Sequence, residues 1–263
     1  MPEMVVPDVP DRQRSATRKW RMLFELPWKY WGPVLELRNV MSGSSVRRFR
    51  KRNVGKSSYV DPSVQIFGWE QVSMGDNSVL SEGTWLNANT RNGHKDHIVI
   101  GNYCHIGRRN YFSSGESIVV KDFAFTGLDC HFLGCGHKID SPLLPYIATG
   151  LTAGAPIEIG INCWLTTAVT VLEGVRIGYG SVVGARSVVV EDLPPFSRAI
   201  GSPCRVVKRF DFRSNTWIAA ADFTDVHSGY MPTESEYLTA LLESGSGLMP
   251  SLHASSGRFG WLR

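Results

Sequence analysis

Residues 174–192 read GVRIGYGSVVGARSVVVED, and this stretch decides the fold. Counting from Val171 just upstream, an aliphatic residue returns at every sixth position: Val171, Ile177, Val183 and Val189. A helix repeats its faces with a period of about 3.6 and a strand with a period of two, so neither element explains a spacing of six. The stretch therefore indicates a repeat architecture.

The same spacing runs back through much of the chain. Eighteen positions carry it, in six groups of three, and only Thr126 among them is not apolar. Every step longer than six follows the third position of a group, so three six-residue segments make one turn and extra residues leave at one corner. The pattern predicts an all-β fold, a parallel β-helix of about six coils around one continuous core. The eighteen core positions are Val54, Val60, Ile66, Met74, Leu80, Leu86, Ile100, Ile106, Phe112, Val120, Thr126, Phe132, Ile159, Leu165, Val171, Ile177, Val183 and Val189.

The residues around the core positions suit a narrow column. A small or β-branched residue stands two positions before the core residue in sixteen of eighteen cases, and Arg52 and Asn110 are the exceptions. Glycine follows the core residue eight times, as expected at tight corners. Three of the five cysteines occupy the small inward position, which predicts packing and not metal ligation. They are Cys104, Cys130 and Cys163.

The repeat divides the chain into three segments. Residues 1–53 form a basic, aromatic N-terminal segment that we expect to be helical, and residues 54–210 form the β-helix domain. Residues 211–263 are a C-terminal extension, in which Thr233 begins a capping box and predicts a short helix over about 234–244.

The charge is concentrated near the N-terminus. The whole chain has a net charge of +4, whereas residues 12–56 carry thirteen Lys or Arg against two acids. Basic residues mixed with tryptophan and tyrosine favour peripheral contact with an anionic membrane, or else an aromatic cap on the end of the column. No apolar run is long enough to span a membrane, no signal core precedes the repeat, and nothing resembles a nucleic-acid-reading module. We therefore expect a cytoplasmic protein, peripheral at the inner membrane if the basic segment binds lipid.

Residues 156–208 resemble the C-terminal signature of the hexapeptide-repeat acyltransferases, in particular the O-acetyltransferases of sugars and of bacterial surface polysaccharides. The likeness is strong over residues 98–210 and rests on periodicity alone over residues 54–97. It implies a left-handed coil, a homotrimer with active sites between subunits, and acetyl-CoA as the acyl donor.

The longest corner insertion, residues 133–156, contains the candidate catalytic residue His137. A neutral imidazole suits the removal of a proton from an acceptor hydroxyl at neutral pH. In the family that these residues resemble, the histidine of a similar segment, here His137-Lys138-Ile139-Asp140, is the catalytic base. The alternative is that His137 only anchors its loop.

The resemblance also implies binding residues. On the donor side, Thr167, Gly184 and Ala185 match family positions that meet coenzyme A. Arg205 and Lys208 match basic positions near its phosphates, although an ordinary surface charge also explains Arg205. On the acceptor side, alignment places Ser113 where the sugar enzymes carry an asparagine, and His131 is expected to line the acceptor site or to orient His137. For these two residues a turn and a plain surface histidine are the alternatives.

These observations predict an acetyl-CoA-dependent O-acyltransferase that acetylates a sugar hydroxyl of a surface polysaccharide or its precursor. Three alternatives stay open: an N-acyltransferase acting on an amino sugar or another amine, a zinc enzyme like the carbonic anhydrases that share this prism, and a non-catalytic scaffold. The zinc enzyme needs three converging histidines, and the sequence does not show the usual close pairing of two of them, so no metal site is predicted.

Overall fold

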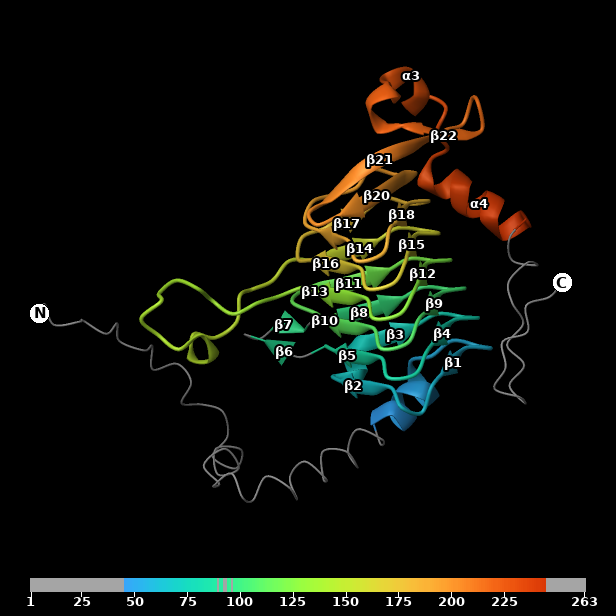
Figure 1. The fold of residues 1–263 in the computed structure, drawn as a ribbon. Helices are drawn as coiled ribbons and strands as arrows, with labels where there is room; N and C mark the ends of the chain where they lie inside the picture. The colour runs from blue at the N-terminus through green and yellow to red at the C-terminus, as the bar shows by residue number, and fades with distance from the viewer. Residues whose placement is uncertain (1–44, 89, 92–93, 96, 245–263) are drawn as a thin grey trace, which may run out of the picture.

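The computed structural model describes residues 45–88, 90–91, 94–95 and 97–244, and the backbone alone for residues 90–91 and 94–95. Within them the chain winds into a triangular column whose three walls are parallel sheets (Figure 1). The predicted β-helix is therefore confirmed. Most of the basic N-terminal segment lies outside the described residues, as does the tail after residue 244.

The nine-stranded wall contains seven parallel strands and two antiparallel strands at its C-terminal end. In spatial order its strands are β1 (Tyr59–Val60), β4 (Val79–Leu80), β9 (His105–Ile106), β12 (Phe125–Thr126), β15 (Trp164–Leu165), β18 (Val182–Val183), β20 (Ser197–Gly201), β21 (Cys204–Asp211) and β22 (Thr216–Ala219).

The other two walls are parallel throughout. The six-stranded wall contains β2 (Gln65–Phe67), β5 (Trp85–Asn87), β10 (Tyr111–Ser113), β13 (His131–Leu133), β16 (Thr170–Leu172) and β19 (Val188–Val189). The five-stranded wall contains β3 (Val72–Met74), β8 (His97–Ile100), β11 (Ser117–Val120), β14 (Ile157–Ile159) and β17 (Arg176–Ile177).

The strand register places the eighteen predicted core residues in three vertical rows, one in each wall. In the six-stranded wall, for example, Leu86 pairs with Phe112 and Phe112 pairs with Phe132. Seventeen of the eighteen residues are buried and Val54 is half-buried. Thr126 fits the row because its hydroxyl accepts a hydrogen bond from the backbone N–H of Gly107, 3.0 Å away. The six-residue period therefore predicted the wall, the level and the inward direction of each of these side chains.

The small inward residues tie successive coils together. The Ser78 hydroxyl donates to the carbonyl oxygen of Gly101 at 2.8 Å, and the Cys104 and Cys163 thiols lie 3.1 and 3.2 Å from the carbonyl oxygens of Lys121 and Gly178. Burial raises the pKa of both thiols to about 12, so each keeps the proton that it donates. The predicted packing role of these cysteines therefore includes a hydrogen bond.

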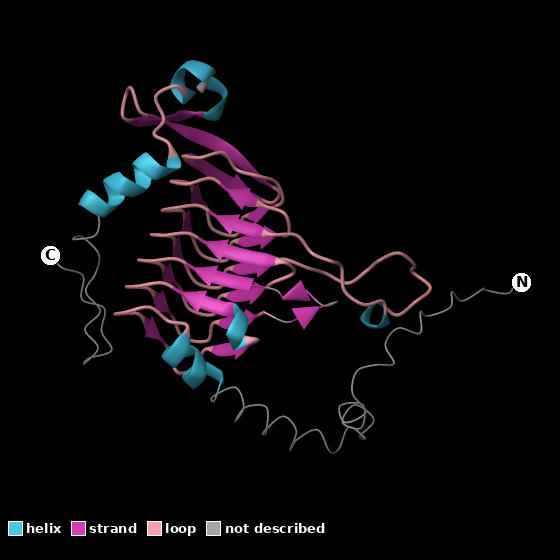
Figure 2. Cartoon of the chain, turned by 180° about the vertical axis from the view of Figure 1, so that it is seen from behind, coloured by secondary structure: helices cyan, strands magenta, loops and turns pink. Residues whose placement is uncertain are grey.

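Two of the corner insertions project from the same side of the column (Figures 1 and 2). One carries the hairpin of β6 (Thr90–Arg91) and β7 (His94–Lys95), and the other is the arm, residues 133–156, which contains the 3-10 helix η4 (Tyr146–Ala148). A shorter insertion forms the 3-10 helix η3 (Trp69–Gln71). All three leave the column between the six-stranded and five-stranded walls, as the spacing predicted.

Both ends of the column are covered. At the first coil, residues 45–52 are helical, and Val46 and Phe49 are buried in the core, so this part of the basic segment acts as a cap. At the last coil, β20 and β21 turn back antiparallel to each other, which the periodicity did not predict. The 3-10 helix η5 (Ala220–Asp222) and helix α3 (Asp225–Ser228) follow β22.

The C-terminal helix α4 (Glu234–Ser244) returns to the side of the column. Its capping box is confirmed: the backbone N–H of Glu236 donates to the Thr233 hydroxyl, and the N–H of Thr233 donates to the Glu236 carboxylate. The ammonium group of Lys121, on the corner after β11, lies 2.7 Å from Glu158 and 2.8 Å from Glu234. These ion pairs fasten the beginning of α4 to the five-stranded wall.

Candidate active site

The arm that carries His137 has an ordered stem. His137 and Leu151 form an antiparallel bridge, and the backbone N–H of Lys138 donates to the carbonyl oxygen of Gly150 at 3.1 Å. The Thr149 hydroxyl closes the stem by donating to the carbonyl oxygen of Lys138 at 2.6 Å. These bonds hold the chain on both sides of His137, so the imidazole projects from a braced backbone.

Three glycines seat the base of the arm on the column. A Cβ atom on Gly115 would lie 1.9 Å from the carbonyl oxygen of Gly134, and one on Gly154 would lie 2.4 Å from the same oxygen. Gly154 also has a φ of +77°, which other residues adopt only with strain. A side chain at either position would push the arm away from the corner. The direction of the arm is therefore fixed by close backbone packing.

The acceptor-side candidates lie at the base of this arm. Ser113 ends β10, is 8% exposed, and places its hydroxyl 3.9 Å from the Cys135 thiol, two residues before His137. His131 begins β13 and faces outward, with its ring 6.5 Å from that of Tyr111. The structure thus gathers Ser113, His131 and the root of the arm at one wall. The His137 imidazole is exposed and has no hydrogen bond or ion pair with any described residue.

Cys135 is a residue of this site that sequence reasoning did not find. The sequence gives little sign of its role, because Cys135 lies in the corner insertion, outside the six-residue repeat. Only the fold reveals that it reaches back from the arm to the end of β10.

The donor-side candidates lie at a different corner, which we call the second corner. It joins the nine-stranded and six-stranded walls and contains Gly107–Arg108, Gly127–Leu128, Thr166–Thr167 and Gly184–Ala185 at successive levels. Thr167 and Ala185 are exposed, and Gly184 is half-buried. A Cβ atom added to Gly184 would lie 2.6 Å from the Ile200 side chain. The predicted cofactor residues Thr167, Gly184 and Ala185 are therefore stacked along one edge.

Carbonyl groups at the second corner are directed into the column. The Asn110 amide donates to the carbonyl oxygens of Gly107 and Gly127 at 2.7 and 2.9 Å, and the Ser187 hydroxyl donates to that of Gly184 at 2.7 Å. Asn110, an exception to the small-residue rule, thus joins two adjacent coils. The Thr166 hydroxyl donates to the carbonyl oxygen of Val183 at 2.8 Å.

The second corner presents a row of backbone N–H groups without acceptors among the described residues. They belong to Arg108, Leu128, Thr167 and Ala185. At the corner between the five-stranded and nine-stranded walls, the equivalent donors of Lys56, Asp76 and Asn102 bond to side chains of the next coil at 2.7–2.8 Å. The donors of Asp122, Ile161 and Tyr179, at the upper levels of that corner, have no acceptor among the described residues either, so both corners carry N–H groups that can donate to a ligand carbonyl.

The two basic candidates lie at the C-terminal end of the nine-stranded wall. Arg205 and Lys208 are exposed on β21, and Lys208 pairs across the sheet with Arg198. The Arg205 guanidinium is not free, because it lies 2.7 Å from Glu191 and also donates to the carbonyl oxygen of Cys204. Lys208 with Arg198 therefore forms the more available positive pair.

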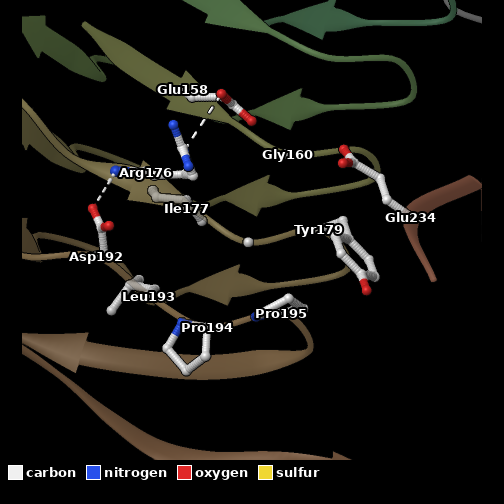
Figure 3. Close-up of a pocket in the computed structure, with 11 residues that line it drawn as sticks. Glu158, Gly160, Arg176, Ile177, Tyr179, Asp192, Leu193, Pro194, Pro195 and Glu234 are labelled. Carbon is white, nitrogen blue, oxygen red and sulfur yellow. Dashed lines mark hydrogen bonds and ion pairs between the residues drawn. The ribbon is translucent and has the colours of Figure 1, made fainter. Parts of the chain in front are cut away.

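A hollow of about 430 Å³ lies elsewhere, on the five-stranded wall beneath α4 (Figure 3). It is lined by Glu158, Arg176, Asp192 and Glu234, whose charges are already paired with one another, with Lys121 or with a backbone N–H. No sequence-predicted site residue lines it. The hollow reflects how α4 seats on the column.

The zinc alternative requires a cluster of metal-ligating side chains. Across the part of the chain that the structure describes, no group of three or more His, Cys, Asp or Glu side chains is placed to hold an ion. In the same residues no helix has the length and apolarity needed to cross a membrane.

Comparison with known proteins finds relatives that are similar to part of the chain. No family model matches the chain. It is 38% identical over 114 residues to a Staphylococcus aureus (strain COL) protein named "Putative acetyltransferase", covering 43% of this chain and 56% of that one. It is 31% identical over 145 residues to a Mycobacterium tuberculosis "Probable acetyltransferase", covering 54% and 47%. The chain thus spans about half the length of the curated relatives it matches.

Among solved structures, the fold is similar to AntD, an N-acyltransferase of Bacillus cereus, in complex with dTDP and coenzyme A. The TM-score is 0.54 at 20% identity, covering 64% of this chain and 90% of that one. At this identity the likeness supports the shared fold. The six-residue repeat and the triangular column are thus shared with an acyltransferase fold, and over about half of their length the chain is similar to curated acetyltransferases.

Proposed function

We propose that this protein is an acyl-CoA-dependent O-acyltransferase that transfers an acetyl group to a sugar hydroxyl of a bacterial surface polysaccharide or its precursor. One observation carries the proposal: a row of unpaired backbone donors stands at the second corner, at the positions of Thr167 and Ala185. Such donors can bond the amide carbonyls of a pantetheine arm and the oxyanion that forms on a thioester carbonyl.

The chemical step uses His137 as general base. The acceptor oxygen attacks the thioester carbonyl carbon while the imidazole takes the hydroxyl proton. The C–S bond then breaks, and the coenzyme A thiolate leaves and receives a proton. The braced stem of the arm supports this role, because it holds the imidazole in the open, where an acceptor hydroxyl can approach.

The active site requires more than one copy of the chain. The arm leaves the six-stranded wall at the end of its strands, whereas the second corner lies at their beginning. Six residues separate the two corners in one coil, a distance of roughly 20 Å at about 3.3 Å per residue. We propose a homotrimer in which the arm of one copy places His137 beside Thr167 and Ala185 of its neighbour.

Complementation between inactive variants tests this shared site. His137→Ala removes the base, and Gly184→Val is expected to block the second corner, because even a Cβ there contacts Ile200. Each variant alone should be inactive, and co-expression should restore a fraction of activity in mixed oligomers. Purified mixed oligomers without any activity would show that base and second corner belong to the same copy.

The basic pair supports binding of the nucleotide end of the donor. Replacing Lys208 by alanine should raise the KM for acetyl-CoA about fivefold, because an exposed ion pair contributes up to roughly 1 kcal/mol. The KM for acetyl-dephospho-CoA, which lacks the 3′-phosphate, should change less. Arg205→Ala should raise the KM for acetyl-CoA less than Lys208→Ala, since the Arg205 guanidinium already forms an ion pair with Glu191. If Lys208→Ala raised the KM for acetyl-CoA and for acetyl-dephospho-CoA equally, Lys208 would not contact the 3′-phosphate.

N-acylation is the second candidate, because the structurally similar AntD is an N-acyltransferase crystallised with dTDP-4-amino-4,6-dideoxyglucose and coenzyme A. The same base and the same donor row would serve an amine as acceptor. A panel of hydroxyl and amino sugars, with release of coenzyme A as the readout, separates the two. Turnover with amino sugars alone would replace the O-acyltransferase proposal, and no turnover with any acceptor would contradict both.

A further inference from the structure

The outer face of the six-stranded wall carries a continuous aromatic track. Its rings come from four neighbouring strands: Phe67 on β2, Trp85 on β5, Tyr111 on β10 and His131 on β13. The ring centroids are 6.1, 5.0 and 6.5 Å apart in that order, and the planes are tilted by 51–66°. All four side chains are half-buried, so each packs on its neighbours and still presents part of its ring.

The residues beside the track are uncharged. The other outward positions of the six-stranded wall include the polar residues Gln65, Asn87, Ser113 and Thr170 and the apolar residues Leu133, Leu172 and Val188, and among the described side chains of its six strands none is Asp, Glu, Lys or Arg. A face without charge offers nothing to a phosphate-rich nucleic acid or an anionic lipid surface. Rings edged by amide and hydroxyl groups match a ligand that has apolar ring faces and many hydroxyls.

One polar atom of the track lacks a partner. The indole N–H of Trp85 is buried between its neighbours and has no acceptor among the described residues. A buried donor without an acceptor is costly, and a rotation of the indole toward the surface would let a ligand hydroxyl accept from it. On the nine-stranded wall, Phe125 and Trp164 are 40% and 46% exposed and stack on each other with their ring planes 10° apart.

The track is continuous with the proposed acceptor site. His131 and Ser113 stand at its upper end, at the root of the arm that carries His137. Four strands at about 4.8 Å spacing give the track a length of about 14 Å, longer than one sugar ring. A chain bound here would present one residue to His137 and extend its others down the wall.

We propose that the aromatic track Phe67–Trp85–Tyr111–His131 is an extended subsite for a neutral oligosaccharide chain, so that the acceptor is a sugar chain and not a single sugar. The inference rests on the proposed function, because it deepens the acceptor side of the same site. It assigns the length preference for the acceptor to Trp85 and Phe67, which lie away from the reacting group.

Binding to the full-length protein tests the track directly. Isothermal titration with malto- and chito-oligosaccharides of one to six residues should show affinity that rises with length up to about four residues. Trp85→Ala should weaken binding of the four-residue sugar about five- to tenfold, the effect of losing one aromatic contact, and should leave binding of the monosaccharide unchanged. Trp85→Phe keeps the ring and should retain most of the affinity. Trp164→Ala, on the nine-stranded wall, is the matched control and should behave as wild type.

The outcomes separate this inference from the proposed function. Affinity that does not depend on length, or a Trp85→Ala variant that is folded and binds both probes normally, would overturn the track. A changed sedimentation coefficient of Trp85→Phe or Phe67→Leu with normal sugar binding would overturn it too, by showing that the face is an interface between copies. Acyl transfer to a monosaccharide alone would leave the proposed function intact, whereas length-dependent binding without any transfer would contradict only the proposed function.

Discussion

Replacement of His137 by alanine is expected to lower the rate of acyl transfer at least about a hundredfold while the fold is retained. A positioned general base contributes about 10²–10⁴-fold, which corresponds to roughly 3–5 kcal/mol of activation free energy. The loss should appear in kcat measured as release of coenzyme A at saturating acetyl-CoA. Affinity for acetyl-CoA should change little, because the proposed donor-binding residues lie at the second corner.

The structure offers a suitable control. His131 is the other histidine near the base of the arm, but it lies on the wall with its ring against Tyr111. Replacement of His131 by alanine should raise the KM for the acceptor and leave most of kcat. Circular dichroism and thermal unfolding should be the same for both variants and wild type, because the His137 side chain contacts no described residue through a hydrogen bond or ion pair. Unchanged turnover of a folded His137→Ala variant would remove this histidine from the mechanism.

The column could be predicted from sequence because its determinants are local. Each coil repeats the same short pattern of an inward apolar residue, a small residue and a corner, so the spacing alone gave the wall and the level of residues such as Phe112 and Val183. The position of the arm followed in the same way. Only the close backbone packing of the arm's base on the column, through Gly115, Gly134 and Gly154, could not be predicted without the structure.

The C-terminal end could not be predicted in the same way. Strands β21 and β22 are antiparallel and follow no six-residue period, so their pairing depends on contacts that the repeat does not encode. The seating of α4 likewise depends on Lys121, which is 113 residues away from Glu234. Local propensity predicted the helix and its capping box but not the surface that receives it.

The proposed donor-binding edge could be predicted only partly from the sequence. Asp76, Asn102 and Asp122 stand two positions after core residues of the five-stranded wall, and their side chains satisfy the corner N–H groups there. The equivalent positions at the second corner include Glu82, Arg108, Leu128, Thr167 and Ala185, of which only Glu82 is an acid. Residue type therefore separates the two corners at the lower coils but not at the upper ones, where the five-stranded wall is followed by Ile161 and Tyr179. The distance between this edge and His137 needed the fold.

Replacement of Phe132 by alanine is expected to lower the free energy of unfolding by about 3–5 kcal/mol, the usual cost of removing a fully buried phenylalanine. Phe132 is 0% exposed, and its ring stacks on that of Phe112 with centroids 4.3 Å apart. The change leaves a cavity between the third and fourth coils, which adjacent side chains cannot fill because the column is narrow. Denaturant unfolding at constant protein concentration measures the loss.

Phe125→Ala is the matched control, since this phenylalanine is 40% exposed on the same coil and should cost about 1 kcal/mol or less. The double variant of Phe112 and Phe132 should lose less than the sum of the single losses, by about 0.5–1.5 kcal/mol, because the stacked pair is broken by either change. In a repeat column each coil is stabilised by its neighbours, so a defect at this level also weakens the seat of the arm on β10 and β13. The Phe132→Ala variant should therefore lose acyl transfer at a lower temperature than it loses β-structure. Parallel loss of both signals would show that the arm and the column unfold as one unit.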